Sequence, residues 1–169
     1  MKNLKLFATL LFVALSLSIF AQRPALHFKG TVMLNNKPMA GVRVYISDAG
    51  AITADVITDA KGKFEVQSFY NKLLSIVVEK EGFVTQNIFV STRLTGMAQE
   101  DMEMKVSFDM YQQPSGTVLK FEEPIGKIAY DYSANKFACD VAYQQEIKVK
   151  LDALQKQISD PVGAAQTAK

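Results

Sequence analysis

Cysteine, histidine and tryptophan are scarce in this 169-residue chain, which has one cysteine, one histidine and no tryptophan. The lone Cys139 excludes an intrachain disulfide. A free thiol in an oxidising compartment is usually buried, so we predict a buried Cys139, with intermolecular pairing as the alternative. A single histidine, His27, cannot build a histidine-rich zinc site, and no H-E-x-x-H motif is present. We therefore interpret His27 as a surface residue of a strand.

Catalytic motifs are missing as well. Neither S-x-x-K nor G-x-S-x-G accompanies the serines, so nucleophilic catalysis has no support. Asp48, Asp55 and Asp59 could meet at one end of a small domain, but no calcium-loop spacing joins them. Glu122 and Glu123 are adjacent on an extended segment and should point in opposite directions. The sequence predicts that the chain is not an enzyme and holds no metal or cofactor.

An excess of charge is lacking too. The chain has 19 basic and 17 acidic residues, and the first 21 residues contribute only Lys2 and Lys5 to this balance. Without them the chain would carry 17 of each sign. Nucleic-acid binding needs a basic surface that displaces counterions, so we expect no nucleic-acid partner.

Residues 1–21 have the pattern of a secretory signal peptide. Lys2 and Lys5 precede an apolar run from Leu6 to Phe20, and small residues stand at Ser18 and Ala21. The run is short for a membrane span, which favours a cleaved signal peptide. The alternative is an uncleaved N-terminal anchor. We predict export to the periplasm or the outer-membrane periphery, or secretion, with no membrane span after cleavage.

Apolar and polar residues then alternate with period two through a series of short segments separated by turn residues. This pattern predicts a mainly β fold: a seven-stranded antiparallel Greek-key-type β-sandwich over residues 22–111. The expected strands are 26–32, 42–47, 53–58, 64–66, 74–78, 83–90 and 102–110.

The stretch from Thr58 to Phe64 joins two of these strands. Asp59 can accept hydrogen bonds from the amides that follow it, and Gly62 can adopt the positive φ that closes a hairpin with a bulge. We predict that Thr58, Asp59, Gly62 and Phe64 are structural, with Phe64 anchored in the core.

The sequence changes character after Tyr111. For residues 112–159 we predict a linker, a hairpin over 125–137 and a helix from Asp140 to Ile158. Ile147 and Leu151 begin an apolar helical stripe that continues at 154 and 158. Residues 160–169 lack any pattern, and we predict a mobile tail.

Four blocks of this sequence, in order, are similar to the carboxypeptidase regulatory-like domain. They are F-K-G-T-V at 28–32, K-P-M-A-G-V-R-V at 37–44, T-D-A-K-G-K-F at 58–64 and K-E-G-F at 80–83. The resemblance implies a transthyretin-like (prealbumin-like) sandwich in which Thr58, Asp59, Gly62 and Phe64 shape a turn. Residues 124–143 resemble the C-terminal segment of exported, uncharacterised bacterial proteins, which implies the cell envelope of a Gram-negative bacterium.

Two functional hypotheses follow. The first is an exported module that binds an envelope protein through a free sandwich edge or the C-terminal helix. The alternative is a carbohydrate-binding module, in which Tyr45, Phe69 and Tyr111 face a glycan. Against the alternative, the hairpin and helix could cover these aromatic residues, because the helical stripe needs an apolar surface.

Overall fold

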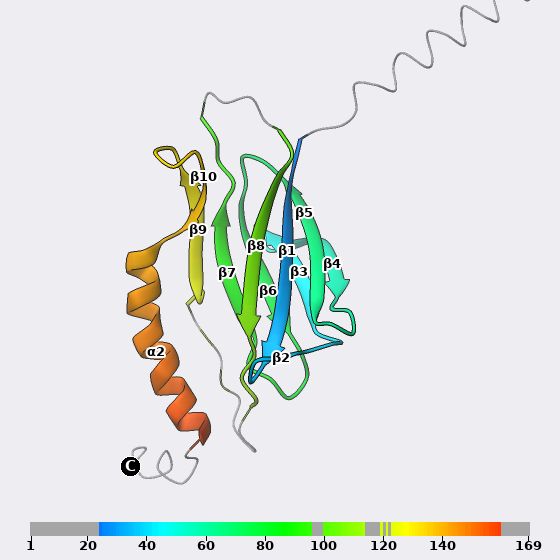
Figure 1. Ribbon diagram of the computed structural model, residues 1–169, viewed down its shortest axis with the longest axis vertical. Helices are drawn as coiled ribbons and strands as arrows, with labels where there is room; N and C mark the ends of the chain where they lie inside the picture. The colour runs from blue at the N-terminus through cyan, green and yellow to red at the C-terminus, as the bar shows by residue number, and fades with distance from the viewer. Residues whose placement is uncertain (1–23, 96–99, 114–118, 120, 122, 160–169) are drawn as a thin grey trace, which may run out of the picture.

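A computed structural model describes residues 24–95, 100–113, 119, 121 and 123–159 of the chain (Figure 1). Its strands form two sheets, and one helix follows them in sequence. The predicted signal peptide (1–21) and tail (160–169) lie outside the described residues. Among the described residues, no helix has both the length and the apolar character needed to cross a bilayer.

The smaller sheet is built around its first strand, β1. β1 is antiparallel to β5 and to the very short β2, and it is parallel to β8. Its strands are β1 (Ala25–Leu34), β2 (Lys37–Pro38), β5 (Lys63–Phe69) and β8 (Met102–Asp109).

The larger sheet has six strands in the order β10-β9-β7-β6-β3-β4. Neighbouring strands are antiparallel except β7 and β9, which are parallel. Its strands are β3 (Arg43–Asp48), β4 (Ala51–Ile57), β6 (Leu73–Glu79), β7 (Gln86–Ser91), β9 (Gly126–Asp131) and β10 (Lys136–Cys139).

The core lies between the sheets and is filled by the alternating apolar residues of the strands. On β3, for example, Val44 and Ile46 are fully buried. The residues that alternate with them, Arg43 and Tyr45, lie on the outer face. The largest fully buried side chains include Phe28, Phe108, Leu26, Ile46, Leu74 and Ile76.

Gly30 lies on the inward phase of β1, where a side chain would be expected. It pairs with Phe64 of β5, and a Cβ at residue 30 would lie 2.3 Å from the Phe64 ring. The ring of Phe64 therefore occupies the space that the missing side chain leaves, and it also packs 6.3 Å from the ring of Phe108. An aromatic side chain that covers a glycine in this way shields the backbone and fixes the strand register.

The C-terminal part extends the six-stranded sheet. β9 and β10 form a hairpin whose first strand pairs with β7, and helix α2 (Val141–Ser159) follows. The Oδ1 atom of Asp140 accepts a hydrogen bond from the Tyr143 amide at 3.0 Å, which caps the helix as predicted. Ile147 is buried and Leu151 half-buried; the side chains of Leu154 and Ile158 lie outside the described residues.

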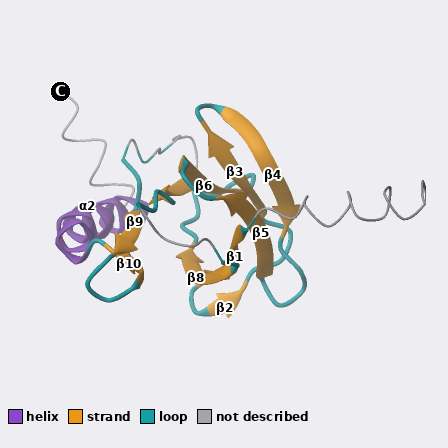
Figure 2. Cartoon of the chain, turned by 90° about the horizontal axis from the view of Figure 1, so that it is seen from above, coloured by secondary structure: helices purple, strands orange, loops and turns teal. Residues whose placement is uncertain are grey.

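The predicted fold class is confirmed: a mainly β sandwich of two sheets with a C-terminal hairpin and helix. The two parallel pairings, β1 with β8 and β7 with β9, were not anticipated from the sequence. α2 and β4 lie at opposite sides of the molecule (Figure 2).

Candidate functional site

The turn from Thr58 to Phe64 holds its shape through its own side chains. Asp59 Oδ1 accepts hydrogen bonds from the amides of Lys61 and Lys63, each at 2.8 Å. Gly62 has φ +68°, and a Cβ there would lie 2.5 Å from the Val32 carbonyl oxygen. The chain therefore needs a glycine at this position for both backbone conformation and space.

One prediction about this turn is wrong. β4 before the turn pairs with β3 in one sheet, and β5 after it pairs with β1 in the other, so the turn crosses between sheets instead of closing a hairpin. Thr58 anchors the crossing, because its hydroxyl donates to the Met39 carbonyl oxygen at 2.8 Å and accepts from the Val42 amide at 3.0 Å. Thr58 is 4% exposed, and Phe64 is 6% exposed in the core.

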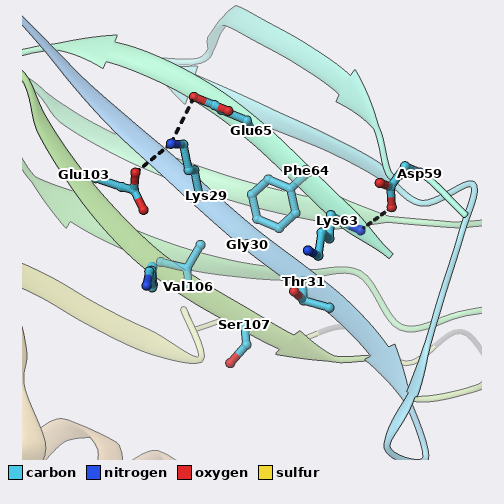
Figure 3. Close-up of a pocket in the computed structure, with 11 residues that line it drawn as sticks. Lys29, Gly30, Thr31, Asp59, Lys63, Phe64, Glu65, Glu103, Val106 and Ser107 are labelled. Carbon is cyan, nitrogen blue, oxygen red and sulfur yellow. Dashed lines mark hydrogen bonds and ion pairs between the residues drawn. The ribbon is translucent and has the colours of Figure 1, made fainter. Parts of the chain in front are cut away.

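A hollow of about 650 Å³ lies on the smaller sheet, over β5, β1 and β8 (Figure 3). The side chain of Lys29 stands in its upper part and bridges two carboxylates, with its Nζ atom 2.6 Å from Glu103 and 3.9 Å from Glu65. The hydrogen bond with Glu103 raises the pKa of Lys29 and lowers that of Glu103. Lys29 is thus held between two carboxylates, and Lys63 and Lys105 also line the hollow.

Strands β4, β3 and β6 are linked on their outer face by Arg43. Its Nη2 atom lies 2.7 Å from Asp55 and its Nη1 atom 2.6 Å from Glu79, while the guanidinium carbon lies 4.9 Å from the centroid of the Tyr45 ring. Hydrogen bonding to Arg43 holds the pKa of Asp55 below its ordinary value. Two carboxylates share one guanidinium, so this cluster carries a net negative charge.

β4 forms one edge of the six-stranded sheet, and β3 is its only partner among the strands that the structure describes. Two of its aliphatic side chains are exposed, Ile52 at 52% and Ile57 at 61%. The strand has the sequence A-I-T-A-D-V-I, without lysine or proline. Lysine and proline are common protections of a sheet edge; the protection of β4 consists of Asp55 and of a register shift against β3 between Ile46 and Ser47.

The absence of gatekeeper residues between 51 and 57 was visible in the sequence. Sequence reasoning missed its meaning because a strand's alternation does not reveal whether it is central or at an edge. In the structure, the only charged residue of β4, Asp55, accepts hydrogen bonds from the guanidinium of Arg43.

The three predicted glycan-facing aromatics are not brought together. Tyr45 lies on the outer face of β3, and Phe69 ends β5 in the other sheet, where it is 51% exposed. Tyr111 follows β8 and packs against Phe121, with ring centroids 6.4 Å apart. Burial raises the pKa of Tyr111. The three rings therefore form no common platform.

The acidic residues near the turn also have separate roles. Asp48 forms an ion pair with Lys72 at 2.7 Å, Asp55 binds Arg43, and Asp59 caps its own turn. His27 lies 3.3 Å from Glu65 on the outer face of β1. Within the described ranges, no cluster of three or more histidine, cysteine or acidic residues is placed to hold a metal ion.

Cys139 is exposed, contrary to the prediction that it is buried. It is the last residue of β10, an edge strand, and the helix cap Asp140 follows it directly. The strand leaves the sheet at this point, and nothing packs over the thiol strongly enough to bury it.

No protein-family model matches the chain, and no curated protein matches it. Solved structures with similar folds include 3-chlorocatechol 1,2-dioxygenase from Rhodococcus opacus 1CP, at 13% identity and a TM-score of 0.41, covering 54% of this chain and 61% of that one. Catechol 1,2-dioxygenase from Acinetobacter sp. ADP1 is similar at 14% identity and a TM-score of 0.43, covering 62% and 59%.

The major pilin subunit of Bacillus cereus, BcpA, is similar at 22% identity and a TM-score of 0.38, covering 57% of this chain and 33% of that one. The chain spans less than two thirds of the length of each of these three structures. At these identities the likeness concerns the β-sandwich fold alone.

The prediction that the chain is not an enzyme, which rested on missing catalytic motifs, is corrected. Structures found similar to the chain include dioxygenases, at 10–15% identity. A sandwich without a familiar catalytic motif is no argument for the absence of an activity.

Proposed function

We propose that the chain is an exported β-sandwich module of the carboxypeptidase regulatory-like type that acts by protein–protein interaction in the envelope of a Gram-negative bacterium. The four sequence blocks at 28–83 support the family, and the leader-like residues 1–21 support export to the periplasm or the outer-membrane periphery. The partner in this proposal is an envelope protein.

One observation carries the proposal: the two edges of the six-stranded sheet are treated differently. The sheet ends at β10 on one side and at β4 on the other; β10 exposes no large apolar side chain, whereas β4 exposes Ile52 and Ile57. A bare apolar edge is a liability for a soluble domain unless a partner uses it. A glycan-binding role has no comparable support, because its three aromatic residues lie apart.

Photo-crosslinking in the native bacterium tests the proposal. A photoreactive amino acid is placed at Ile57 on β4, at Val149 on the exposed side of α2 (71% exposed), and at Lys105 on the polar face of the smaller sheet as a control. We expect a discrete crosslinked species with an envelope protein from Ile57 or Val149 and none from Lys105.

Absence of crosslinks from both Ile57 and Val149, in cells that export the chain, would overturn the proposed function. Export is checked in the same cells by fractionation. The full chain should appear in the envelope or periplasmic fraction, and a chain without residues 2–21 should stay in the cytoplasm. Cytoplasmic recovery of the full chain would contradict the proposed location.

A further inference from the structure

We propose that β4 is the docking edge and that it takes an extended strand of a partner protein, one that alternates aliphatic residues and carries a lysine or arginine. This inference rests on the proposed function and specifies its site and its partner. It depends on three features of the edge: its backbone, its apolar side chains and the charge next to it.

The backbone of β4 presents unpaired groups at alternate residues. The Thr58 amide donates to the Val42 carbonyl at 2.9 Å, and residues on the same phase of β4, Val56 and Ala54, face β3. In an antiparallel ladder the residues between them turn their N–H and C=O groups the other way. Asp55 and Ile57 therefore direct these groups to the open side, and among the described strands none pairs with β4 there.

Such a row of donors and acceptors matches an extended backbone. Strand addition uses these main-chain hydrogen bonds for affinity and the side chains at alternate positions for specificity. On β4, Ile57 lies on the outer face opposite Arg43 of β3, and the pairing is regular from Ile57 to Ala54; the register shifts before Ile52, which pairs with Ser47. An added strand along the regular part would set a side chain beside Ile57, which favours an aliphatic residue there.

The charge beside the edge selects a cationic residue. A hollow of about 550 Å³ lies beside Ile57 and is also lined by Arg43, Glu79 and Glu81. Arg43 is already shared between Asp55 and Glu79. No ion pair of Glu81 is found among the described residues. The lining balances its two glutamates with Arg43 and Lys80, and Asp55 of β4, which shares Arg43, adds one negative charge in excess.

Lys80, which also lines this hollow, donates from its Nζ atom to the Ala40 carbonyl oxygen at 2.6 Å and keeps its positive charge, which balances one glutamate. The excess negative charge is that of Asp55 and Glu79 around the single guanidinium of Arg43, and a lysine or arginine of the added strand next to Ile57 would complement it.

The same charge disfavours a second copy of the chain as the occupant. Pairing two β4 strands about a two-fold axis near Ala54 would place the two Asp55 carboxylates diagonally across the new ladder on one face. Each would bring its net negative Arg43 cluster to the junction, and like charges at such positions destabilise strand pairing.

A blocked nine-residue peptide that alternates valine and threonine, with lysine at its centre, is the probe. Amide chemical shifts of the purified full chain are followed by NMR as this peptide is added. We expect shifts confined to β4 and its neighbours, led by Asp55 and Ile57, and a weaker response to the same peptide with glutamate in place of lysine.

The variant Ile57→Lys places a gatekeeper charge on the edge and should abolish the shifts. Val149→Lys on α2, at a position that is 71% exposed against 61% for Ile57, is the matched control and should bind as the unmodified chain does. Amide spectra of both variants without peptide verify that each is folded.

Three results would overturn the inference: no peptide-induced shifts, shifts centred on α2 or on the smaller sheet, or sedimentation of the free chain as a dimer that Ile57→Lys dissolves. If envelope crosslinks form but the peptide does not bind β4, the proposed function stands and the docking edge is wrong. If the peptide binds β4 but no envelope crosslinks form, the proposed function fails instead.

Discussion

The two edges of the six-stranded sheet differ in how they are finished. Beyond β7, the chain adds the β9–β10 hairpin and lays α2 over it, with Ile147 and Tyr130 buried. At the other edge, β4 has no strand beyond it and exposes Ile52 and Ile57. The hairpin moves that edge of the sheet outward to β10, which exposes no large apolar side chain, whereas β4 exposes two; this difference favours β4 as the edge for a partner strand.

The crossing turn joins β4 of the larger sheet to β5 of the smaller sheet, so breaking this turn should have the largest effect. Gly62→Val meets a positive φ and the Val32 carbonyl oxygen 2.5 Å from its Cβ. We expect a loss of about 3–4 kcal/mol in the free energy of unfolding, from backbone strain together with overpacking. Denaturant titration measures it.

The matched control is Gly50→Val, because Gly50 has φ +87° but no atom within 4 Å of its Cβ. Strain alone should cost about 1–2 kcal/mol there. Equal losses for the two variants would show that the close contact of Gly62 with β1 does not contribute.

The covered edge can be exposed selectively. Ile147 lies on the buried side of α2 and is 3% exposed, and Ile147→Asp buries a charge unless the helix detaches. We expect α2 to lose helical circular dichroism and amide protection while the sandwich keeps its own. Val149→Asp, at a position that is 71% exposed, should leave the helix docked. Unfolding of the whole sandwich by Ile147→Asp would contradict the separation of the two regions.

A smaller change at the covered edge is Tyr143→Phe. The Tyr143 hydroxyl donates to the Pro124 carbonyl oxygen at 2.6 Å, and its ring lies 3.8 Å from the Lys127 Nζ atom. Losing this hydrogen bond should weaken the docking of α2 by about 1 kcal/mol. Hydrogen exchange of the α2 amides measures this effect, and the exchange of the β3 and β6 amides should not change.

The smallest effect concerns charge at the bare edge. Hydrogen bonds from Arg43 lower the pKa of Asp55, so the stabilisation is complete above the pKa of unfolded aspartate, about 3.9, and is lost as the pH falls through the lower folded pKa. A carboxyl NMR titration should show this low pKa and its return toward the ordinary value in Arg43→Gln.

Asp131 on the covered side provides the comparison, because the Ser133 hydroxyl and nearby amides lower its pKa. Arg43→Gln should leave the titration of Asp131 unchanged. A shift of both carboxyls would mean that the substitution perturbs the sheet as a whole.

Much of the fold could be predicted from local patterns. Alternation identified the strands because it reports which residues face the core, and Asp140 identified the start of α2 through its capping geometry. Alternation says nothing about which strand lies next to another. The parallel pairing of β1 with β8, and the crossing of the 58–64 turn between sheets, therefore could not be predicted.

For the candidate site, too, local features could be predicted from the sequence, whereas features that depend on strand order could not. The sequence 51–57 displays an apolar strand without gatekeepers, but only the strand order makes it an edge. Tyr45, Phe69 and Tyr111 each stand off the core phase or near a strand end, yet their distribution over two sheets and a linker depends on topology. Cys139 was misjudged for a related reason, because its exposure follows from its place at the end of an edge strand.

Amide hydrogen exchange of the free, monomeric chain tests the central claim most directly. If β4 is a bare edge, the amides of Asp55 and Ile57 exchange rapidly while those of Val56 and Ala54, which face β3, are protected. The β9 amide of Ile128, between β7 and β10, should be protected as well. Slow exchange at Asp55 and Ile57 in the monomer would show that the edge is already covered and would contradict the account.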